Sequence, residues 1–240
     1  MIISGHQPVY LPSIHLFTKI ALSDVFMFLG HCQFVNQSWH SRNVIRCGKG
    51  TLTLSVPIKK AGSFGQSISD AYINGDHWKR KHLGSIHDNY RKSPYFDMYY
   101  PDIESLISRP WQRLGALNMA LIMKFIQWLE IDTKIIVSQD YDIFGKKNDM
   151  LISMCEAANV TRYLSNIGSE SYVNEDYLLE KAISHYWMSF DALPYDQIPH
   201  HSLDGRYTRG QFIEKLSIID LFFNMGPKAR DIVLSSGRIS

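Results

Sequence analysis

The first thirty or so residues alternate short apolar runs with one amphipathic segment, and this rhythm limits the fold more than any other feature. Ile2 and Ile3 begin a predicted strand that ends in the turn GHQPVYLP, residues 5–12. Ser13 is a typical N-cap for a helix through IHLFTKIAL, and the run VFMFL after Asp24 has the length and the β-forming residues of a buried strand. Because parallel strands are joined by right-handed crossovers, we expect the turn at the carboxyl end of a strand, where open α/β sheets bind ligands.

The same rhythm resumes in the second half of the chain. TKIIVS is predicted as a strand, NDMLISMCEAANV as a helix and TRYLS as a strand, and SIIDLFFNMG has the start and stop signals of a helix. The fold class is therefore α/β, with a Rossmann-like parallel sheet flanked by helices.

Two segments interrupt this pattern. NVIR and TLTLSVP flank CGKG as a β-hairpin, about residues 42–57, and SDAYI at 69–73 is predicted as a short strand. A helical insertion follows at about 76–131, with one helix from His77 to about Arg91 and two more separated by Arg109-Pro110, where Pro110 suits a first helical turn. We predict a single domain over residues 1–240 that contains both segments.

Composition narrows the class of function. The chain has 45% hydrophobic residues and a net charge of +2 with its 25 basic residues scattered, so no basic tract indicates nucleic acid or anionic lipid. No export signal or membrane span is predicted, and three cysteines without a CxxC pair fit a reducing compartment. These features favour a cytoplasmic protein that acts on small molecules.

The turn itself holds the first candidate residues. His6 is placed to bind an anion or move a proton near neutral pH, unless it only hydrogen-bonds the backbone, and Gln7 is open to the same two interpretations. Two prolines and Tyr10 make the turn stiff, as a binding site requires. His15 and Lys19 share one helical face, either beside an anion or simply in solvent.

Later segments offer weaker candidates. QFVNQSWHSRN brings together amides, an aromatic ring and a guanidinium, which suit a sugar or phosphate but equally suit a strand entry. On the helix from His77, the face with Trp78 and His82 is mostly core, although His82 or Lys81 could touch a ligand. Its histidines recur every five residues and so turn away from one another, and no cluster in the chain has metal-ligand spacing. YLSNIGSESY is a weak phosphate-loop signal. A cysteine is usually a small buried hydrophobe, but Cys32 lies close to polar candidates.

An ordered set of blocks resembles the WbqC-like proteins from His6 to Gly226: HQPVYLP, FTKIALSD, QF, SWHSRN, LTLSVPI, WKRKH, SPYF, RYLS and LSIIDLFFNMG. That family is associated with bacterial surface polysaccharide, especially O-antigen, and its members have been proposed to transfer glycine or a related acyl group to an amino sugar. The resemblance therefore implies a transferase that forms an amide on a nucleotide-linked amino sugar.

The resemblance also implies which residues form the site. The catalytic candidates are His6, Gln7 and Arg42, with His6 as general base or acyl-phosphate stabiliser and Arg42 as a phosphate or carboxylate ligand. The substrate-binding candidates are Tyr10, Lys19, Gln33, Trp39, Asn43, Trp78, Lys81, His82, Ser165 and Tyr172. Ser13 and His15 replace the family's usual tryptophan and glycine, and Ser41 replaces an asparagine, so His15 receives no family-wide role.

Two alternatives stay open. HQPVYLPSIH has the outline of the histidine-bearing turn in nucleotide-dependent enzymes of the HIGH-motif type, which favours an ATP-dependent amide ligase using ATP with magnesium. The second alternative is a non-catalytic protein that binds the nucleotide sugar as a partner of another polysaccharide enzyme. The acyl donor is a free amino acid with ATP, an aminoacyl-tRNA or a carrier thioester, and nucleic acid would be a partner only in the second case.

Overall fold

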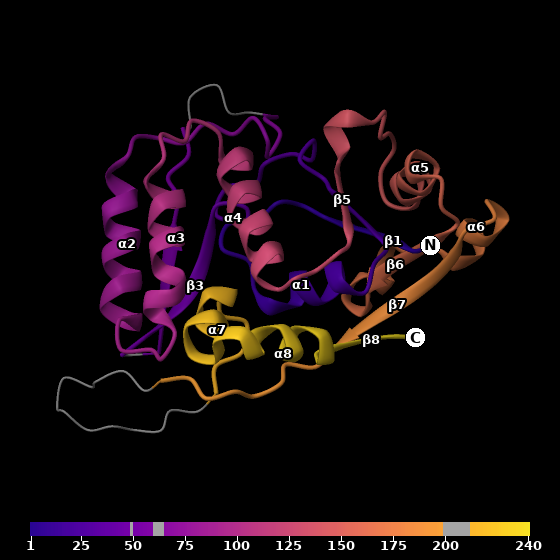
Figure 1. The fold of residues 1–240 in the computed structure, drawn as a ribbon. Helices are drawn as coiled ribbons and strands as arrows, with labels where there is room; N and C mark the ends of the chain where they lie inside the picture. Colours follow the sequence, from indigo (N-terminus) through magenta and orange to yellow (C-terminus); the bar gives the residue numbers. More distant parts are fainter. Residues whose placement is uncertain (49, 60–64, 199–211) are drawn as a thin grey trace.

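The centre of the molecule is a six-stranded sheet in the order β5-β2-β1-β6-β7-β8 (Figure 1). This computed structural model describes residues 1–48, 50–59, 65–198 and 212–240. The sheet strands are β1 (Ile3–His6), β2 (Val25–Phe28), β5 (Lys134–Val137), β6 (Arg162–Asn166), β7 (Ser184–Phe190) and β8 (Gly237–Ile239). Neighbouring strands run parallel except β8, which is antiparallel to β7. The predicted α/β class with a Rossmann-like sheet is confirmed.

The strand order reverses between β1 and β6. From β1 the chain moves outward to β2 and β5, then returns to place β6 on the other side of β1. His6 lies opposite Phe28, and Phe28 opposite Val137, so the carboxyl ends of β1, β2 and β5 are level. Such a switch point leaves a crevice at the carboxyl edge where α/β proteins bind ligands.

Helices cover both faces of the sheet, which explains the uninterrupted apolar run of β2. Phe26 and Phe28 belong to the core that α1 and α8 help to form, whereas Val25 and Met27 pack with α5 in a second core. The covering helices are α1 (Ile14–Ala21) and α8 (Ala229–Ser235) on the first side, and α5 (Asn148–Ala158) and α6 (Glu175–Glu180) on the second. Helix α7 (Ile218–Met225) continues the first core toward the hairpin and the helical insertion.

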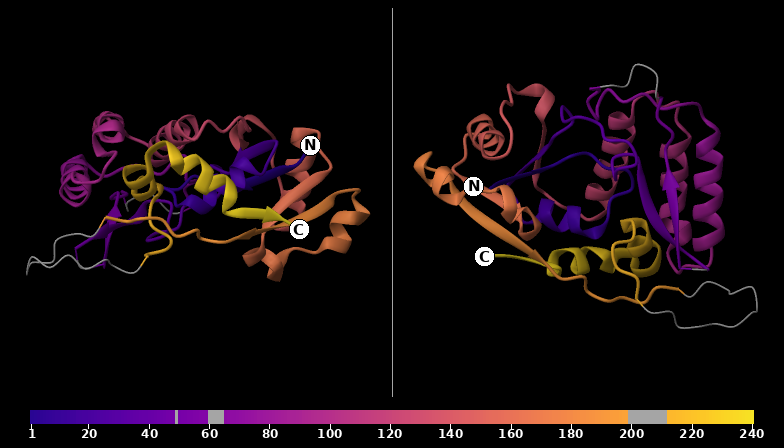
Figure 2. Two further views of the ribbon diagram at one scale, coloured as in Figure 1. Left: turned by 60° about the horizontal axis from the view of Figure 1, so that its bottom comes forward. Right: turned by 180° about the vertical axis from the view of Figure 1, so that it is seen from behind.

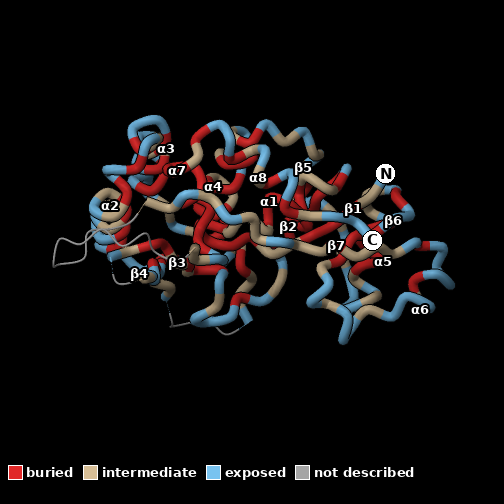
Figure 3. Tube along the Cα trace, turned by 90° about the horizontal axis from the view of Figure 1, so that it is seen from below, coloured by how far each residue is buried: buried red, intermediate tan, exposed pale blue. Residues whose placement is uncertain are grey.

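The hairpin and the helical insertion lie together at one end of the molecule (Figures 1 and 2). They contain β3 (Arg42–Cys47), β4 (Gly50–Ser55), α2 (His77–Tyr90), α3 (Phe96–Ser108) and α4 (Leu114–Trp128). Short 3-10 turns are η1 (Ser138–Asp140), η2 (Ile167–Tyr172) and η3 (Gly226–Lys228). Figure 3 shows the buried backbone running continuously from this end into the sheet. Within the described ranges, no helix is long and apolar enough to cross a membrane.

The predicted elements agree with the structure except in three places. Residues 69–73 form no strand, only isolated bridges such as Ile58 with Ile73, so that prediction is wrong. Pro110 lies before α4, which begins at Leu114, rather than in its first turn. The elements α6, α8, β7 and β8 were not predicted, because α6, α8 and β8 are short and β7 has a mixed polarity without a strand pattern.

Two glycine substitutions test the packing of β1 with opposite expected signs. A Cβ on Gly5 would meet Met154 Cε and come within 3.0 Å of the Met27 carbonyl oxygen, whereas a Cβ on Gly84 in α2 meets nothing. We predict that Gly5→Ala lowers the free energy of unfolding by about 1–3 kcal/mol. Gly84→Ala should raise it by about 0.5–1 kcal/mol. Urea unfolding followed by circular dichroism measures both, and equal stability of the two variants would contradict the close packing of β1 against α5.

Candidate functional site

Side chains from other parts of the chain fix the turn of residues 5–12. Lys19, only 4% exposed, donates from Nζ to the Gly5 carbonyl oxygen at 3.0 Å. Asn118 donates from Nδ2 to the carbonyl oxygens of Pro8 at 3.2 Å and His40 at 2.8 Å. Burial of a loop requires such partners, because unpaired carbonyl groups away from water are costly.

The second half of the turn is held by Asn43. Its Nδ2 donates to the carbonyl oxygens of Tyr10 at 3.2 Å and Leu11 at 2.8 Å. Leu11 is fully buried with a φ of 43°, a left-handed conformation that costs a side chain of this size about 1 to 2 kcal/mol. The side-chain amide of Asn43, a predicted substrate-binding residue, therefore donates its hydrogens to the strained backbone around Leu11 and stabilises it.

Tyr10 points away from the turn into the helical insertion. Its hydroxyl hydrogen-bonds His82 Nδ1 at 2.9 Å, and its ring meets Trp78 edge-on. All three side chains are buried. The structure thus brings Tyr10, Trp78 and His82 together, as a support beneath the turn.

His6 is held as a neutral base. Its Nδ1 lies 2.7 Å from the Gln7 carbonyl oxygen, an acceptor, so Nδ1 carries the hydrogen and Nε2 the lone pair. Burial, followed by the positive charge of Lys19, lowers the pKa of His6 to about 4. At neutral pH the imidazole is therefore uncharged and able to accept a proton.

His6 faces a cavity of about 380 Å³ between the start of α1, the hairpin and the segment before α7. Its lining residues are His6, Val9, Pro12, Ser13, His15, Leu16, Trp39, Asn43, Val44, Phe190, Glu214 and Lys215. The volume suits a small organic substrate. The cavity lies beside the first turn of α1, whose backbone amides favour negative charge.

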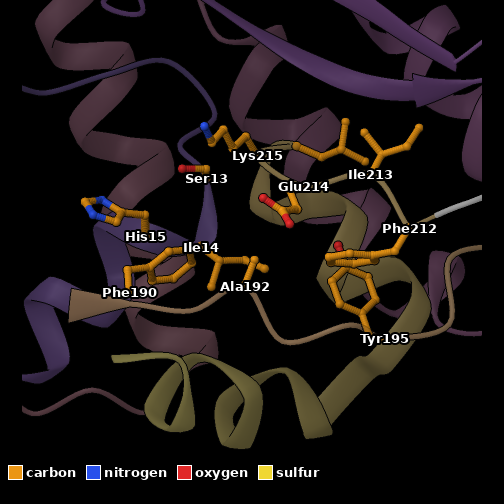
Figure 4. A pocket seen from close by; sticks show the side chains of 11 residues that line it. Ser13, Ile14, His15, Phe190, Ala192, Tyr195, Phe212, Ile213, Glu214 and Lys215 are labelled. Atoms are coloured by element: carbon orange, nitrogen blue, oxygen red, sulfur yellow. The ribbon is translucent and has the colours of Figure 1, made fainter. Parts of the chain in front are cut away.

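Distant segments complete this cavity. The His15 ring meets Phe190, the last residue of β7, edge-on at 5.0 Å between ring centroids. Burial, followed by Lys19, lowers the pKa of His15 to about 4. Figure 4 shows the adjoining smaller pocket, where His15 and Phe190 lie beside each other and Glu214 and Lys215 extend from the segment before α7. Sequence reasoning assigned no role to Phe190, Glu214 or Lys215, because no local motif marks them.

Trp39, which lines the cavity, has a cation next to its ring. Trp39 is 56% exposed, and the Arg42 guanidinium carbon lies 5.8 Å from its ring centroid. Arg42 has no side-chain hydrogen bond or ion pair among the described residues. An exposed indole next to an available guanidinium suits a sugar ring that carries a phosphate.

The remaining predicted residues do not line the cavity. Gln7 bonds His40 Nε2 at 2.9 Å through its Oε1. Ser165 is buried in β6, where its hydroxyl bonds His185 Nε2 at 2.8 Å, and the exposed Tyr172 bonds Ser169. Gln33 and Lys81 lie in solvent. Across the described ranges, no three His, Cys, Asp or Glu side chains gather as metal ligands.

The fold and the cavity define a class: an α/β protein with a Rossmann-like sheet and a histidine-bearing pocket at the switch point. The chain belongs to the WbqC-like protein family, whose sequence model matches residues 7–232. It is similar to the uncharacterized protein Rv1507c of Mycobacterium tuberculosis, with 28% identity over 226 residues and 94% coverage of each chain. No solved structure matches.

The lowered histidine pKa values predict how stability depends on pH. The pKa of His15 is about 4 in the folded protein and 6.5 in the unfolded chain, so between these values the unfolded state binds more protons. The contribution of His15 to the free energy of unfolding therefore falls as the pH drops through this window. We predict that His15→Gln removes about 2 kcal/mol of the stability lost between pH 8 and pH 5.

Urea unfolding of both proteins at pH 8 and pH 5 measures this difference. Comparing the two proteins cancels the contributions of other titrating groups. A variant that loses as much stability as the wild type on acidification would show that His15 is not buried as described.

Proposed function

We propose that this protein is a transferase that joins an amino acid or other acyl group, such as glycyl, to the amino group of a nucleotide-linked amino sugar for O-antigen assembly. The observation that carries the proposal is the neutral His6 imidazole, whose Nε2 has no hydrogen-bond partner among the described residues, facing a cavity at the sheet's switch point. Membership of the WbqC-like family supports a biosynthetic enzyme.

The chemistry needs a base at the amine. An attacking amine forms a C–N bond to the acyl carbonyl carbon, loses a proton and expels the leaving group. His6 Nε2 would take that proton, and a pKa of about 4 leaves it unprotonated at neutral pH before each turnover. The Arg42 guanidinium, next to the cavity residue Trp39, would offset negative charge on phosphate or on the carbonyl oxygen.

The walls of the cavity suit a nucleotide-linked sugar. Trp39 offers a flat apolar surface for a sugar ring, and Phe190 adds a second apolar surface across the cavity. The start of α1 and Lys215 supply positive potential for a diphosphate. We place the reaction in the cytoplasm, where thiols such as those of this chain's three free cysteines stay reduced.

A substitution at His6 tests this proposal. We predict that His6→Asn lowers the rate of amide formation by about 100-fold or more while binding of the nucleotide sugar changes little. Mass spectrometry would follow the mass of UDP- and dTDP-linked amino sugars incubated with amino acids, ATP and magnesium, or with an aminoacyl thioester. The matched control is His77→Asn, which changes an exposed histidine at the start of α2 and should keep wild-type activity.

Two results would contradict the proposal. Wild-type turnover in His6→Asn would show that His6 is not the base in amide formation. Wild-type protein that binds the nucleotide sugar yet modifies it with no donor would favour the non-catalytic binding partner.

A second candidate is an ATP-dependent amide ligase. The specific observation in its favour is that His6, at the end of β1, and His15, in the first turn of α1, line one cavity beside a helix N-terminus. This arrangement would suit the phosphates of ATP, which would arrive as its magnesium complex. Ligase chemistry activates a free amino acid as an acyl-adenylate and releases pyrophosphate.

Pyrophosphate release separates the two candidates. For the proposed transferase, we predict amide formation from an aminoacyl thioester without ATP and no amino-acid-dependent exchange of labelled pyrophosphate into ATP. Exchange that is lost in both His6→Asn and His15→Gln would establish the ligase instead.

A further inference from the structure

A cysteine and a histidine lie at the carboxyl edge of the sheet, beside the cavity residue His6 but outside the cavity. His31 and Cys32 follow β2, and Cys32 Sγ lies 3.9 Å from His31 Nε2. Ser138 is the first residue after β5, and Gln7 is the first residue after β1. The ends of three adjacent parallel strands thus bring these four side chains to the edge where α/β proteins carry out chemistry.

The hydrogen bonds around His31 orient it as a base toward the thiol. Its Nδ1 lies 2.6 Å from Ser138 Oγ, and the Ser138 hydroxyl donates to Gln139 Oε1 at 3.2 Å. Because the Ser138 hydrogen points to Gln139, its oxygen accepts from His31 Nδ1–H. His31 Nε2 then carries the lone pair, directed at the Cys32 thiol, in the nucleophile–base–orienter arrangement of thiol enzymes.

Gln7 completes the arrangement with a donor. His40 Nδ1 accepts from the Val35 amide at 3.4 Å, so its Nε2 carries the hydrogen and donates to Gln7 Oε1 at 2.9 Å. With its Oε1 engaged by His40, Gln7 keeps its amide N–H groups as donors, and against the larger effect of burial, which raises the pKa of Cys32, Gln7 lowers it. Such a donor beside a nucleophilic sulfur is also placed to hydrogen-bond a developing oxyanion.

Charge and exposure agree with a base-assisted thiol. Burial raises the pKa of Cys32 and lowers that of His31, so at neutral pH the pair consists of a thiol and a neutral imidazole that is able to deprotonate it. Cys32 is only partly buried and His31 is exposed, so an acyl donor has access. By contrast, the Ser165–His185 pair is buried and Cys155 lies in the core.

We propose that Cys32 carries the acyl group as a thioester, with His31 as its base, Ser138 and Gln139 as positioning residues, and Gln7 as oxyanion donor. This inference rests on the proposed function, for which it supplies the donor half-site. His31 takes the thiol proton as Cys32 Sγ forms a C–S bond to the carbonyl carbon of an acyl thioester or ester. The donor's leaving group departs with that proton.

The second half of the reaction returns the thiol. The sugar amine attacks the Cys32 thioester, a C–N bond forms as the C–S bond breaks, and His6 takes the amine proton. His6 releases this proton to solvent, and the Cys32 thiolate takes one up in exchange through His31, which restores both the thiol and the neutral bases. His6 and Gln7 are consecutive residues, so one turn carries a group of the acceptor site and a group of the donor site. The donor class is therefore an activated acyl group that needs no ATP at this step.

The test uses the S-glycyl thioester of N-acetylcysteamine as donor and peptide mass mapping as readout. We expect wild-type protein to gain one glycyl group at Cys32 at least ten times faster than at Cys47, the partly buried reference thiol in β3. His31→Asn should slow glycylation of Cys32 about tenfold and leave the glycylation rate of Cys47 unchanged, so Cys47 reports within the same protein whether the variant remains folded. Equal rates at the two thiols, or a wild-type rate in His31→Asn, would overturn the proposal.

Amide formation in Cys32→Ala separates this inference from the proposed function. Loss of the amide product in Cys32→Ala, with Cys47→Ala fully active, supports the thioester carrier. Wild-type amide formation in Cys32→Ala overturns the carrier and leaves the proposed transferase intact. Glycylation of Cys32 that depends on His31 but yields no sugar amide supports the thiol site and overturns the amino sugar as acceptor.

Discussion

The structure depends on the hydrogen bonds that other segments donate to the carbonyl groups of the buried turn of residues 5–12. Between β1 and α1 the chain runs through the interior without a sheet or helix to pair its backbone. Donors come instead from the Lys19 side chain, the Asn43 and Asn118 amides and the Ile218 backbone N–H. Because these donors lie in α1, β3, α4 and α7, the turn ties four parts of the fold together and takes its geometry from all of them.

This arrangement makes the carboxyl edge of the sheet asymmetric. His6 faces the cavity on the side of α1, whereas Gln7 is engaged by His40 outside that cavity. The buried Lys19 between the turn and the sheet adds positive charge that, together with burial, keeps His6 neutral. The consecutive residues His6 and Gln7 therefore lie in different environments, His6 beside an apolar and aromatic cavity and Gln7 in a network of hydrogen bonds.

The local sequence pattern was enough to predict the elements whose structure is determined by neighbouring residues. The apolar run VFMFL, the hairpin and the buried face with Trp78 and His82 follow from periodicity and turn residues that act within a few positions. The role of Phe190 could not be predicted, because β7 reads SHYWMSF with mixed polarity and becomes a strand only between β6 and β8. Asn118 is a polar residue in the otherwise apolar helix α4, and its role could not be predicted because its partners lie 110 and 78 residues away. The placement of Cys32 near His31 was visible in the sequence, but the orienting Ser138 arrives only when β5 pairs with β2.

The closure of the turn by the last part of the chain has a consequence for synthesis. Ile218 N–H donates to the Pro12 carbonyl oxygen at 2.7 Å, and Thr18 Oγ1 donates to the Val233 carbonyl oxygen at 2.9 Å. Both links join segments more than two hundred residues apart. The turn and α1, which are synthesised first, therefore cannot complete these hydrogen bonds until α7 and α8 have been synthesised. A chain that stalls before α7 and α8 are translated leaves the turn open to chaperones and proteases.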